Sequence, residues 1–500
     1  MGPKKLAYPS MFFLFFLLSI PYLFSDLWMD ELLSFWDYFR LPSLGEVVTS
    51  YPVANNHIHF SAVMWMWCRW GSPYEPWIRI PCLFFAMATL FSILYWGSGR
   101  WKSGPWTVGL SVCASPVLMP FFFQLRGYSF SIFLATLSFF GMSFLEEGKW
   151  KRGMALSVPS FLLLPGVLPT NSLLLLAYLL FLSGRFLLHP GRSRGIALLV
   201  LSVCATVGFI PYFCIWDQFV SVLKSPLGWK SPWETSGHLV LAALAHGLVL
   251  FLAISIAKAG PKKQQRSRWI ERLFSDFDGG ICACSLLVVV SSVFLVKPSP
   301  FPRVFLVFFP VLTIVLGNRL DHFPDSLHSR FRSLSARRFH LLLAVAVLIN
   351  YFGWTALTDW TSSRKIAQGE YPQNLLEQFY RKSQDASRTV DEIGRLEPGP
   401  VCLICTFHSW YTFRHYWRLS GRDPEPIFLG ESLPGPNWKR NVPLHLQSKL
   451  EKGAGNRLFF IASTQEQVVS FIPREIGKER IKRIGGSGIY KVFKIMPQER

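Results

Sequence analysis

Two neighbouring carboxylates are the residues best suited by type to take part in a chemical reaction. Asp30 and Glu31 follow closely after an apolar run from Leu6 to Phe24, and a polar stretch with Asn56 and His57 comes later in the same loop. A carboxylate can take the proton of a hydroxyl group as that group attacks an electrophilic carbon. Asp30 and Glu31 are therefore candidates for a general base.

Four cations come later in the chain, each near the edge of an apolar run: Arg79, Arg126, Lys297 and Arg303. Ionisable groups at such positions are costly and usually serve a function, and arginine can bind phosphate through two parallel hydrogen bonds. Each residue also has a structural interpretation, because a long cationic side chain at the interface can reach the lipid headgroups. Together the acids and cations have the composition needed to bind an anionic lipid headgroup and to deprotonate a group beside it.

The composition indicates an integral membrane protein. Hydrophobic residues make up 51% of the 500 residues and charged residues only 16%, against about 25% in a typical soluble domain. So few charges cannot cover a water-facing surface. The net charge of +21 is interpreted as Lys and Arg in cytoplasmic loops. No basic run is interleaved with a soluble aromatic platform, so nucleic acid is not expected as a partner.

Eleven apolar runs have about the length that crosses ~30 Å of hydrocarbon. They are Leu6–Phe24 and residues 77–97, 104–121, 127–145, 153–169, 171–188, 195–215, 237–257, 279–296, 303–318 and 339–356. No small-residue cleavage site follows the first run, so we expect it to be retained as a span. Residues 57–70 are apolar but short and carry two His and one Arg. We expect them to form an interfacial or re-entrant segment.

The basic residues are divided unequally between the two sides that these spans create. If residues 57–70 do not cross, the loops on the N-terminal side hold 20 Lys and Arg residues, and the opposite side, without the tail, holds 7. Such an excess marks the cytoplasmic side. We therefore expect a multi-pass protein of the inner cell membrane with a cytoplasmic N-terminus and an extracytoplasmic C-terminal domain.

Polar and charged residues become common from about residue 359. Strand-like runs at 401–407, 457–463 and 488–495 alternate with helical patterns at 371–396, 408–419 and 464–470. This alternation predicts a small α/β domain. The sequence therefore predicts a multi-span domain, residues 1–358, whose first outer loop is 26–76, and a soluble domain, residues 359–500.

Two motifs in the tail have structural interpretations. Cys402 and Cys405 have CxxC spacing, but a strand would turn them to opposite faces. No second Cys pair or His pair stands nearby to complete a zinc site. The Gly-rich stretch 485–488 precedes a strand and not a helix, so we expect a hairpin turn and no nucleotide-binding loop.

Four segments within about residues 6–320 resemble the integral-membrane GT-C glycosyltransferases, which include bacterial protein O-mannosyltransferases and aminoarabinose transferases. The segments are MDELLSF, NNHIHFSAVMWMWCRWGSPYEPWIRIPCLFF, SPVLMPFFFQLRGYSFSIFLATLSFF and PSPFPRVFLVFFPVL. They hold the family's acidic pair, its Asn-His stretch, its Arg-Gly-Tyr and a Pro-Arg-aromatic span. The chain departs from the family at Ile58, where a proline is frequent.

The resemblance implies a GT-C-like fold: an α-helical polytopic membrane protein with a small C-terminal α/β domain. It also implies transfer of a sugar, with inversion, from a polyprenyl-phosphate carrier to an acceptor on the outer face. Membrane lipids are expected as further partners of the protein. Whether the acceptor is a lipid, a glycan or a protein stays open.

The resemblance also assigns roles to the candidate residues. Asp30 matches the catalytic acidic position of the family and Glu31 its neighbour. The candidates for binding the donor phosphate are Asn56, His57, Arg79, Arg126, Tyr128, Lys297 and Arg303. A divalent cation, Mg²⁺ or Mn²⁺, with Asp30 and His57 as ligands, is left open as a cofactor.

Two other classes of protein are compatible with many spans and charged interfaces. A transporter or lipid flippase usually places its polar site at the middle of the membrane and shows paired halves. Here the charges gather at the ends of spans and the sequence has no internal repeat. An inactive scaffold that presents residues 359–500 is the second alternative. A transfer assay with polyprenyl-phosphate sugars distinguishes a glycosyltransferase from both alternatives.

Overall fold

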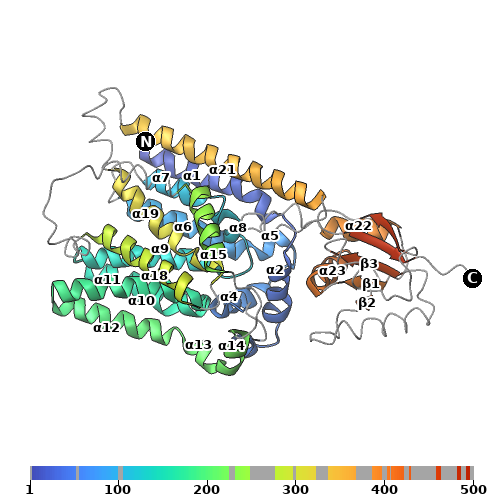
Figure 1. The fold of residues 1–500 in the computed structure, drawn as a ribbon, viewed down its shortest axis with the longest axis horizontal. Helices are drawn as coiled ribbons and strands as arrows, with labels where there is room; N and C mark the ends of the chain where they lie inside the picture. The colour runs from blue at the N-terminus through green and yellow to red at the C-terminus, as the bar shows by residue number, and fades with distance from the viewer. Residues whose placement is uncertain are drawn as a thin grey trace, which may run out of the picture. The chain divides into compact units, whose positions relative to one another are not determined.

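A computed structural model describes most of the chain (Figure 1). The described residues are 3–51, 56–98, 105–223, 231–247, 276–296, 300–321, 336–367, 386–396, 402–405, 407–421, 427–428, 458–462, 481–485 and 491–495.

The chain forms two compact units. The first unit comprises Met1–Leu23, Asp37–Ser72 and Trp77–Thr355, and the second comprises Phe24–Trp36, Pro73–Pro76 and Ala356–Arg500. Two short pieces of the first outer loop therefore belong with the C-terminal part of the chain.

The first unit is a bundle of helices (Figure 1). Its elements, in chain order, are α1 (Pro3–Leu23), α3 (Leu44–Thr49), α4 (Ile58–Cys68), α6 (Ile80–Ser98), α7 (Pro105–Cys113), α8 (Leu118–Phe122), α9 (Tyr128–Glu146), α10 (Trp150–Val167), η2 (Pro169–Asn171), α11 (Ser172–Leu188), α12 (Arg192–Val207), α13 (Ile210–Cys214), α14 (Trp216–Leu223), α15 (Pro232–Ala245), α18 (Phe277–Leu295), η4 (Pro302–Phe305) and α19 (Phe308–Asp321). Helix α21 (Ala336–Ala367), η1 (Phe35–Phe39) and α5 (Glu75–Ile78) continue from one unit into the other.

Hydropathy identifies the segments that suit a membrane. Within the described residues, six are long and apolar enough to cross it: Ile80–Ser98, Tyr128–Glu146, Pro169–Leu188, Arg192–Cys214, Phe277–Leu295 and Leu341–Arg364. Three shorter apolar helices are Tyr8–Leu23, Ile58–Cys68 and Phe308–Gly317. The predicted polytopic helical membrane protein is confirmed. The number of eleven spans stays a prediction, because 248–275 lie outside the described residues.

Helix α4 covers the ambiguous segment 57–70. It has 11 residues, which make about 16 Å of helix at 1.5 Å per residue. This length is about half of the ~30 Å hydrocarbon core, which agrees with the expectation that the segment does not cross the membrane.

The predicted span at 104–121 is wrong as a continuous helix. Helix α7 ends at Cys113 and α8 begins only at Leu118. Pro116 and Pro120 explain the interruption, because proline lacks an amide hydrogen and its ring clashes with the preceding turn of a helix. The whole stretch from 111 to 130 is buried, so the irregular backbone lies inside protein, as membrane proteins require.

His246 ties this interrupted segment to α19. Its Nδ1 lies 2.5 Å from Ser115 Oγ and its Nε2 lies 2.6 Å from Thr313 Oγ1. The Thr313 hydroxyl donates to the carbonyl of Phe309 at 2.7 Å, so it accepts from the imidazole. A neutral ring with its proton on Nε2 satisfies both bonds, with the Ser115 hydroxyl donating to Nδ1.

Close packing of α9 against α10 depends on two glycines. A Cβ at Gly141 would lie 2.4 Å from Ser157 Oγ, and one at Gly153 would lie 2.6 Å from Leu145 Cγ. Small residues let helix backbones approach closely, which is how helices associate within membranes. Helix α9, which follows directly after Arg126, is thereby held inside the bundle.

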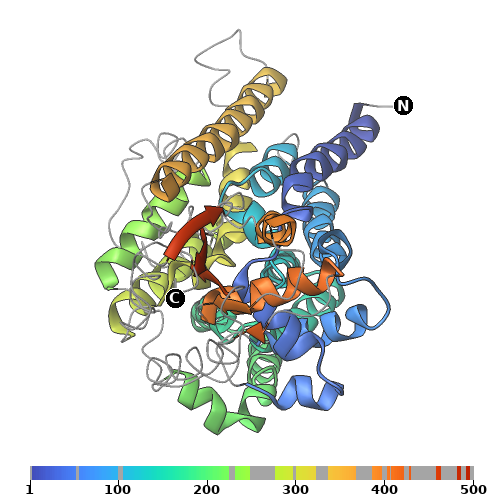
Figure 2. The same cartoon turned by 90° about the vertical axis from the view of Figure 1, so that its right-hand side faces the viewer.

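The second unit contains a five-stranded sheet in the order β2-β1-β3-β5-β4. The strands are β1 (Cys402–Cys405), β2 (Ile427–Phe428), β3 (Leu458–Ala462), β4 (Ile481–Gly485) and β5 (Lys491–Ile495). Strand β1 pairs parallel with β2 and β3, and β5 pairs antiparallel with β3 and β4. Helices α22 (Ala386–Leu396) and α23 (Phe407–Leu419), in orange, lie beside this sheet (Figures 1 and 2). The predicted α/β character of the tail is confirmed.

Two predicted motifs of the tail can be compared with this sheet. Cys402 and Cys405 lie at the two ends of β1, opposite Leu458 and Ile461 of β3, so the strand predicted there is confirmed. The antiparallel pairing of β4 with β5 agrees with a hairpin turn, although residues 486–488 themselves lie outside the described part. The helix predicted at 371–396 is described from Ala386, and the one at 464–470 is outside the description.

Candidate functional site

A buried cluster forms where the loop before α4 meets the start of α9. The rings of His57 and Tyr128 contact each other edge to face, with centroids 5.5 Å apart. The guanidinium carbon of Arg126 lies 5.5 Å from the centre of the Tyr128 ring. None of the three side chains is more than 4% exposed. The structure therefore brings together three of the predicted donor-binding residues.

The positive charges of two arginines, Arg126 and Arg303, act on His57 in this cluster. Burial, together with the charges of Arg126 and Arg303, holds the pKa of the His57 imidazole well below its usual range, so His57 is neutral at pH 7. Burial raises the pKa of Tyr51 to about 12, while the charge of Arg126 acts in the opposite direction. Two arginines thus make one buried point favourable for an anion.

Arg303 comes from η4, far along the chain from the other members. Its guanidinium lies over the ring of Phe301, 4.9 Å from the ring centre, which orients the charged group. Another predicted member, Lys297, lies outside the described residues, and its donor-binding role stays a prediction.

Gly127 permits the close approach of His57 to α9. A Cβ at this position would lie 2.6 Å from Val167 Cγ1 and 2.9 Å from His57 Nδ1. Both distances are shorter than real side-chain contacts, so a larger residue would push the imidazole away from Arg126.

We predict that Gly127→Ala destabilises the protein and disturbs this cluster. Overpacking a buried position typically costs about 1–3 kcal/mol in the free energy of unfolding. Thermal unfolding in detergent should therefore show a lower Tm than that of the parent. Gly237→Ala is the matched control, because nothing lies within 4 Å of a Cβ there. An equal Tm for Gly127→Ala and the parent would contradict the packing argument.

Arg79 has a structural role that the sequence did not indicate. It is 0% exposed, and its NH1 donates to the backbone carbonyls of Tyr22 at 3.0 Å and Leu23 at 3.2 Å. These carbonyls end α1, so the guanidinium completes the hydrogen bonds that a helix C-terminus lacks and offsets its partial negative charge. A phosphate-binding role for Arg79 stays a prediction.

Asn56 also serves the backbone. Its Nδ2 donates to the carbonyls of Val47 and Ser50, each at 2.8 Å. These contacts close the end of α3 and fix the residue that precedes His57. Asn56 thus positions the loop, and its contribution to donor binding stays a prediction.

Asp30 and Glu31 lie in α2 (Met29–Ser34) of the second unit. The backbone amide of Trp28 donates to Glu31 Oε2 at 2.8 Å, and Glu31 is 1% exposed. Glu31 therefore caps the start of its own helix, as the glutamate of a capping box does. Asp30, in contrast, is partly exposed.

The residues left open as metal ligands do not form a described metal site. Among the residues that the structure describes, no three His, Cys, Asp or Glu side chains group together to hold a metal ion. Asp30 and His57 belong to different units. A divalent cation at this pair stays a prediction.

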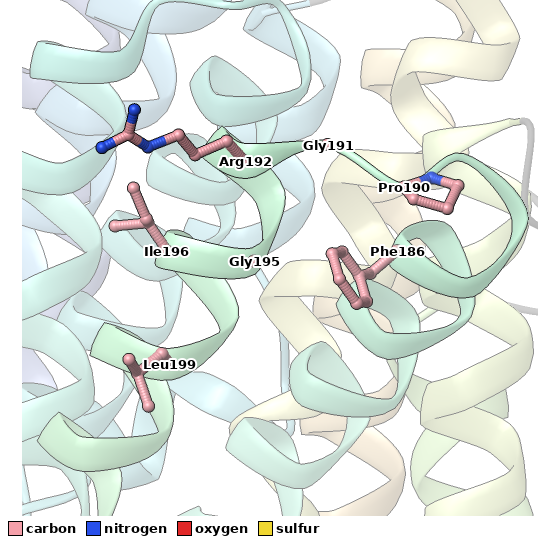
Figure 3. Close-up of a pocket in the computed structure, with 7 residues that line it drawn as sticks. All are labelled: Phe186, Pro190, Gly191, Arg192, Gly195, Ile196 and Leu199. Carbon is pink, nitrogen blue, oxygen red and sulfur yellow. The ribbon is translucent and has the colours of Figure 1, made fainter.

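A separate groove lies between α11 and α12 in the first unit. It has a volume of about 520 Å³ and is lined by Phe186, Pro190, Gly191, Arg192, Gly195, Ile196 and Leu199. Figure 3 shows Arg192, Ile196 and Leu199 following one another along α12. A cation beside apolar side chains also suits a lipid phosphate, so this groove is a useful comparison for Arg126.

Sequence reasoning missed Tyr51 and Tyr416. Tyr51 packs edge to face on Tyr212 with ring centroids 5.9 Å apart, and its amide donates to Gln218 Oε1 at 2.7 Å. These partners are more than 160 residues away in the sequence, and no local pattern marks Tyr51. Tyr416 joins three distant segments of the second unit.

Comparisons with known proteins found similarity at the level of structure. No protein-family model and no curated protein sequence matches this chain. The crystal structure of ArnT from Cupriavidus metallidurans in the apo state aligns with a TM-score of 0.55 and 13% identity, over 96% of this chain and 97% of ArnT. The structure of the same ArnT bound to undecaprenyl phosphate aligns with a TM-score of 0.51 and 12% identity, over 97% and 99% of the two chains.

The chain is an integral membrane protein with a GT-C-like fold, the fold of ArnT. The predicted resemblance to GT-C glycosyltransferases is thereby confirmed for the fold, over nearly the whole chain. A shared fold does not by itself determine the reaction.

Proposed function

We propose that this protein transfers a sugar from a polyprenyl-phosphate carrier to an acceptor on the extracytoplasmic face of the membrane, with inversion at the anomeric carbon. The observation that supports it most is the buried cluster of His57, Arg126 and Tyr128, where the charge of Arg303 also lowers the pKa of His57. This cluster occurs in a fold whose structural neighbour ArnT has been solved with undecaprenyl phosphate.

The phosphate is held by arginine and the proton is taken by a carboxylate. Arg126 and Arg303 bind the phosphate of the carrier, because charge-assisted hydrogen bonds from guanidinium groups suit phosphate oxygens. Tyr128 orients Arg126 through its ring. His57 is neutral, so it adds a polar contact without adding charge. Asp30, and not the capping Glu31, is the general base.

The reaction is a single displacement. The acceptor oxygen attacks the anomeric carbon, a new carbon–oxygen bond forms, and Asp30 takes the hydroxyl proton. The bond between the anomeric carbon and the phosphate oxygen breaks, and its electron pair leaves with the polyprenyl phosphate. Arg126 and Arg303 stabilise the negative charge that develops on the leaving phosphate. Attack opposite the leaving group inverts the configuration.

A transfer assay on the purified protein tests this function. The protein is incubated with radiolabelled polyprenyl-phosphate sugars and extracted membrane lipids, with and without EDTA. We expect label to move from the carrier to a new product, and the EDTA arm decides whether a divalent cation is required. Movement of the carrier across vesicles without transfer would instead favour a flippase.

We predict that the N-terminus is cytoplasmic and the C-terminal domain extracytoplasmic. The unequal division of basic residues between the two sides of the membrane motivates this orientation. Reporter fusions placed after Lys263 and after Gly399 should report opposite sides, cytoplasmic for the first and extracytoplasmic for the second. Two fusions on the same side would overturn this orientation.

A further inference from the structure

Three distant pieces of the chain meet at Tyr416 within the second unit. The backbone amide of Leu27 donates to the Tyr416 hydroxyl at 2.5 Å, and the hydroxyl donates to Glu75 Oε1. Leu27 lies two residues before α2, which carries Asp30, and Glu75 comes from the far end of the first outer loop. One buried hydroxyl on α23 therefore holds both ends of that loop.

Helix α23 also contacts the two residues that follow α2, Phe35 and Trp36. The guanidinium carbons of Arg414 and Arg418 lie 5.4 Å and 4.9 Å from the centre of the Trp36 ring. These two arginines are four residues apart and so share one face of a helix. Between them, His415 contacts the ring of Phe35 edge to face at 5.5 Å. Cation–π and aromatic contacts of this kind stabilise the pairing of α2 with α23.

A third contact lies just before α2. Asp26 accepts hydrogen bonds from the backbone amide of Ser387 at 2.8 Å and from its hydroxyl at 2.9 Å. Ser387 lies in the first turn of α22, where amide groups lack partners within the helix. Residues 24–36 therefore contact the C-terminal domain at two places before α2, Asp26 and Leu27, and at one place after it, Phe35 and Trp36.

The Tyr416 hydroxyl stays protonated and can serve both partners. Burial and the neighbouring carboxylates of Asp26 and Glu75 raise the pKa of Tyr416 well above its usual value. A neutral phenol has one hydrogen to donate and lone pairs that accept. Its single proton goes to Glu75 and its oxygen accepts the Leu27 amide, which fixes the direction of both bonds.

We propose that α23 of the C-terminal domain positions the helix of the general base, with Tyr416 as the positioning residue. This inference rests on the proposed function, because it gives the C-terminal domain the task of orienting Asp30. The domain acts through its contacts with residues 24–36.

The test combines turnover with hydrogen exchange on the full-length protein. In Tyr416→Phe we expect kcat to fall about tenfold, with the KM for the donor within about twofold of the parent value. The substitution removes buried hydrogen bonds and leaves the Leu27 amide and the Glu75 carboxylate without this partner. Amide exchange in Leu27–Ser34 should become faster. Glu75→Gln keeps an acceptor and should stay near the parent, whereas Glu75→Ala should behave like Tyr416→Phe.

Tyr95→Phe is the matched control, because Tyr95 is 61% exposed on α6, and both of its readouts should match the parent. Parental turnover and exchange in Tyr416→Phe would overturn the positioning role and leave the transferase function intact. If Tyr416→Phe does not fold, the comparison of Glu75→Gln with Glu75→Ala decides, and equal exchange in these two would overturn the role. A parent protein without transferase activity would overturn the proposed function instead, while exchange still shows whether Tyr416 holds α2.

Discussion

Asp30→Asn should lower turnover by about two orders of magnitude, the usual scale for the loss of a general base. Asparagine keeps the size of the side chain and most of its hydrogen bonds but cannot take the proton of the acceptor hydroxyl. Binding of the polyprenyl-phosphate carrier should be nearly unchanged, because the phosphate is assigned to the arginines of the first unit. The loss should therefore fall on kcat and leave the KM for the donor unaltered.

The neighbouring glutamate provides a contrast for this prediction. Glu31 accepts the Trp28 amide at 2.8 Å, and a glutamine in its place still offers an oxygen to that amide. We therefore expect Glu31→Gln to keep most of the turnover. Asp217→Asn serves as the control, since Asp217 is an exposed carboxylate on α14.

Turnover and carrier binding are measured on the purified parent and the three variants. Near-parental turnover in Asp30→Asn would remove Asp30 as the base. A larger loss in Glu31→Gln than in Asp30→Asn would transfer the role of base to Glu31.

The spans were predictable because hydropathy over about 20 residues depends on local composition alone. The interruption between α7 and α8 was missed for the opposite reason. Its apolar residues satisfy a span pattern, whereas the interrupted segment is held by a partner from far away, His246, which contacts the Ser115 side chain. Pro116 and Pro120 were the only local signal, and prolines are tolerated in membrane helices.

The types of residue in the candidate site were predictable from the sequence, but the separate role of each residue was not. The residue types at 57, 126 and 128 indicated the cluster that the structure contains. The backbone contacts of Arg79 and Glu31 depend on where α1 ends and where α2 begins, and sequence boundaries are accurate only to a few residues. The contact between Leu27 and Tyr416 joins residues 389 positions apart, which no single-sequence pattern reveals.

Arg126→Ala should weaken binding of undecaprenyl phosphate by about 10- to 100-fold. A hydrogen bond to a charged group contributes about 1.5–3 kcal/mol, and each 1.4 kcal/mol changes the affinity about tenfold. Arg126 is 4% exposed and lies over the Tyr128 ring, so its guanidinium is held in place before the phosphate arrives. Arg126→Lys keeps the charge but loses the planar fork, and we expect partial recovery of the affinity.

The groove of α12 supplies the control that makes this prediction specific. Arg192 is exposed beside apolar side chains (Figure 3), so Arg192→Ala removes one arginine from a surface that also suits a lipid phosphate. Binding of undecaprenyl phosphate in detergent is measured for each variant, after thermal unfolding shows that each is folded. We expect parental affinity in Arg192→Ala. Unchanged affinity in Arg126→Ala would assign Arg126 to structural anchoring, and a loss confined to Arg192→Ala would move the carrier site to α12.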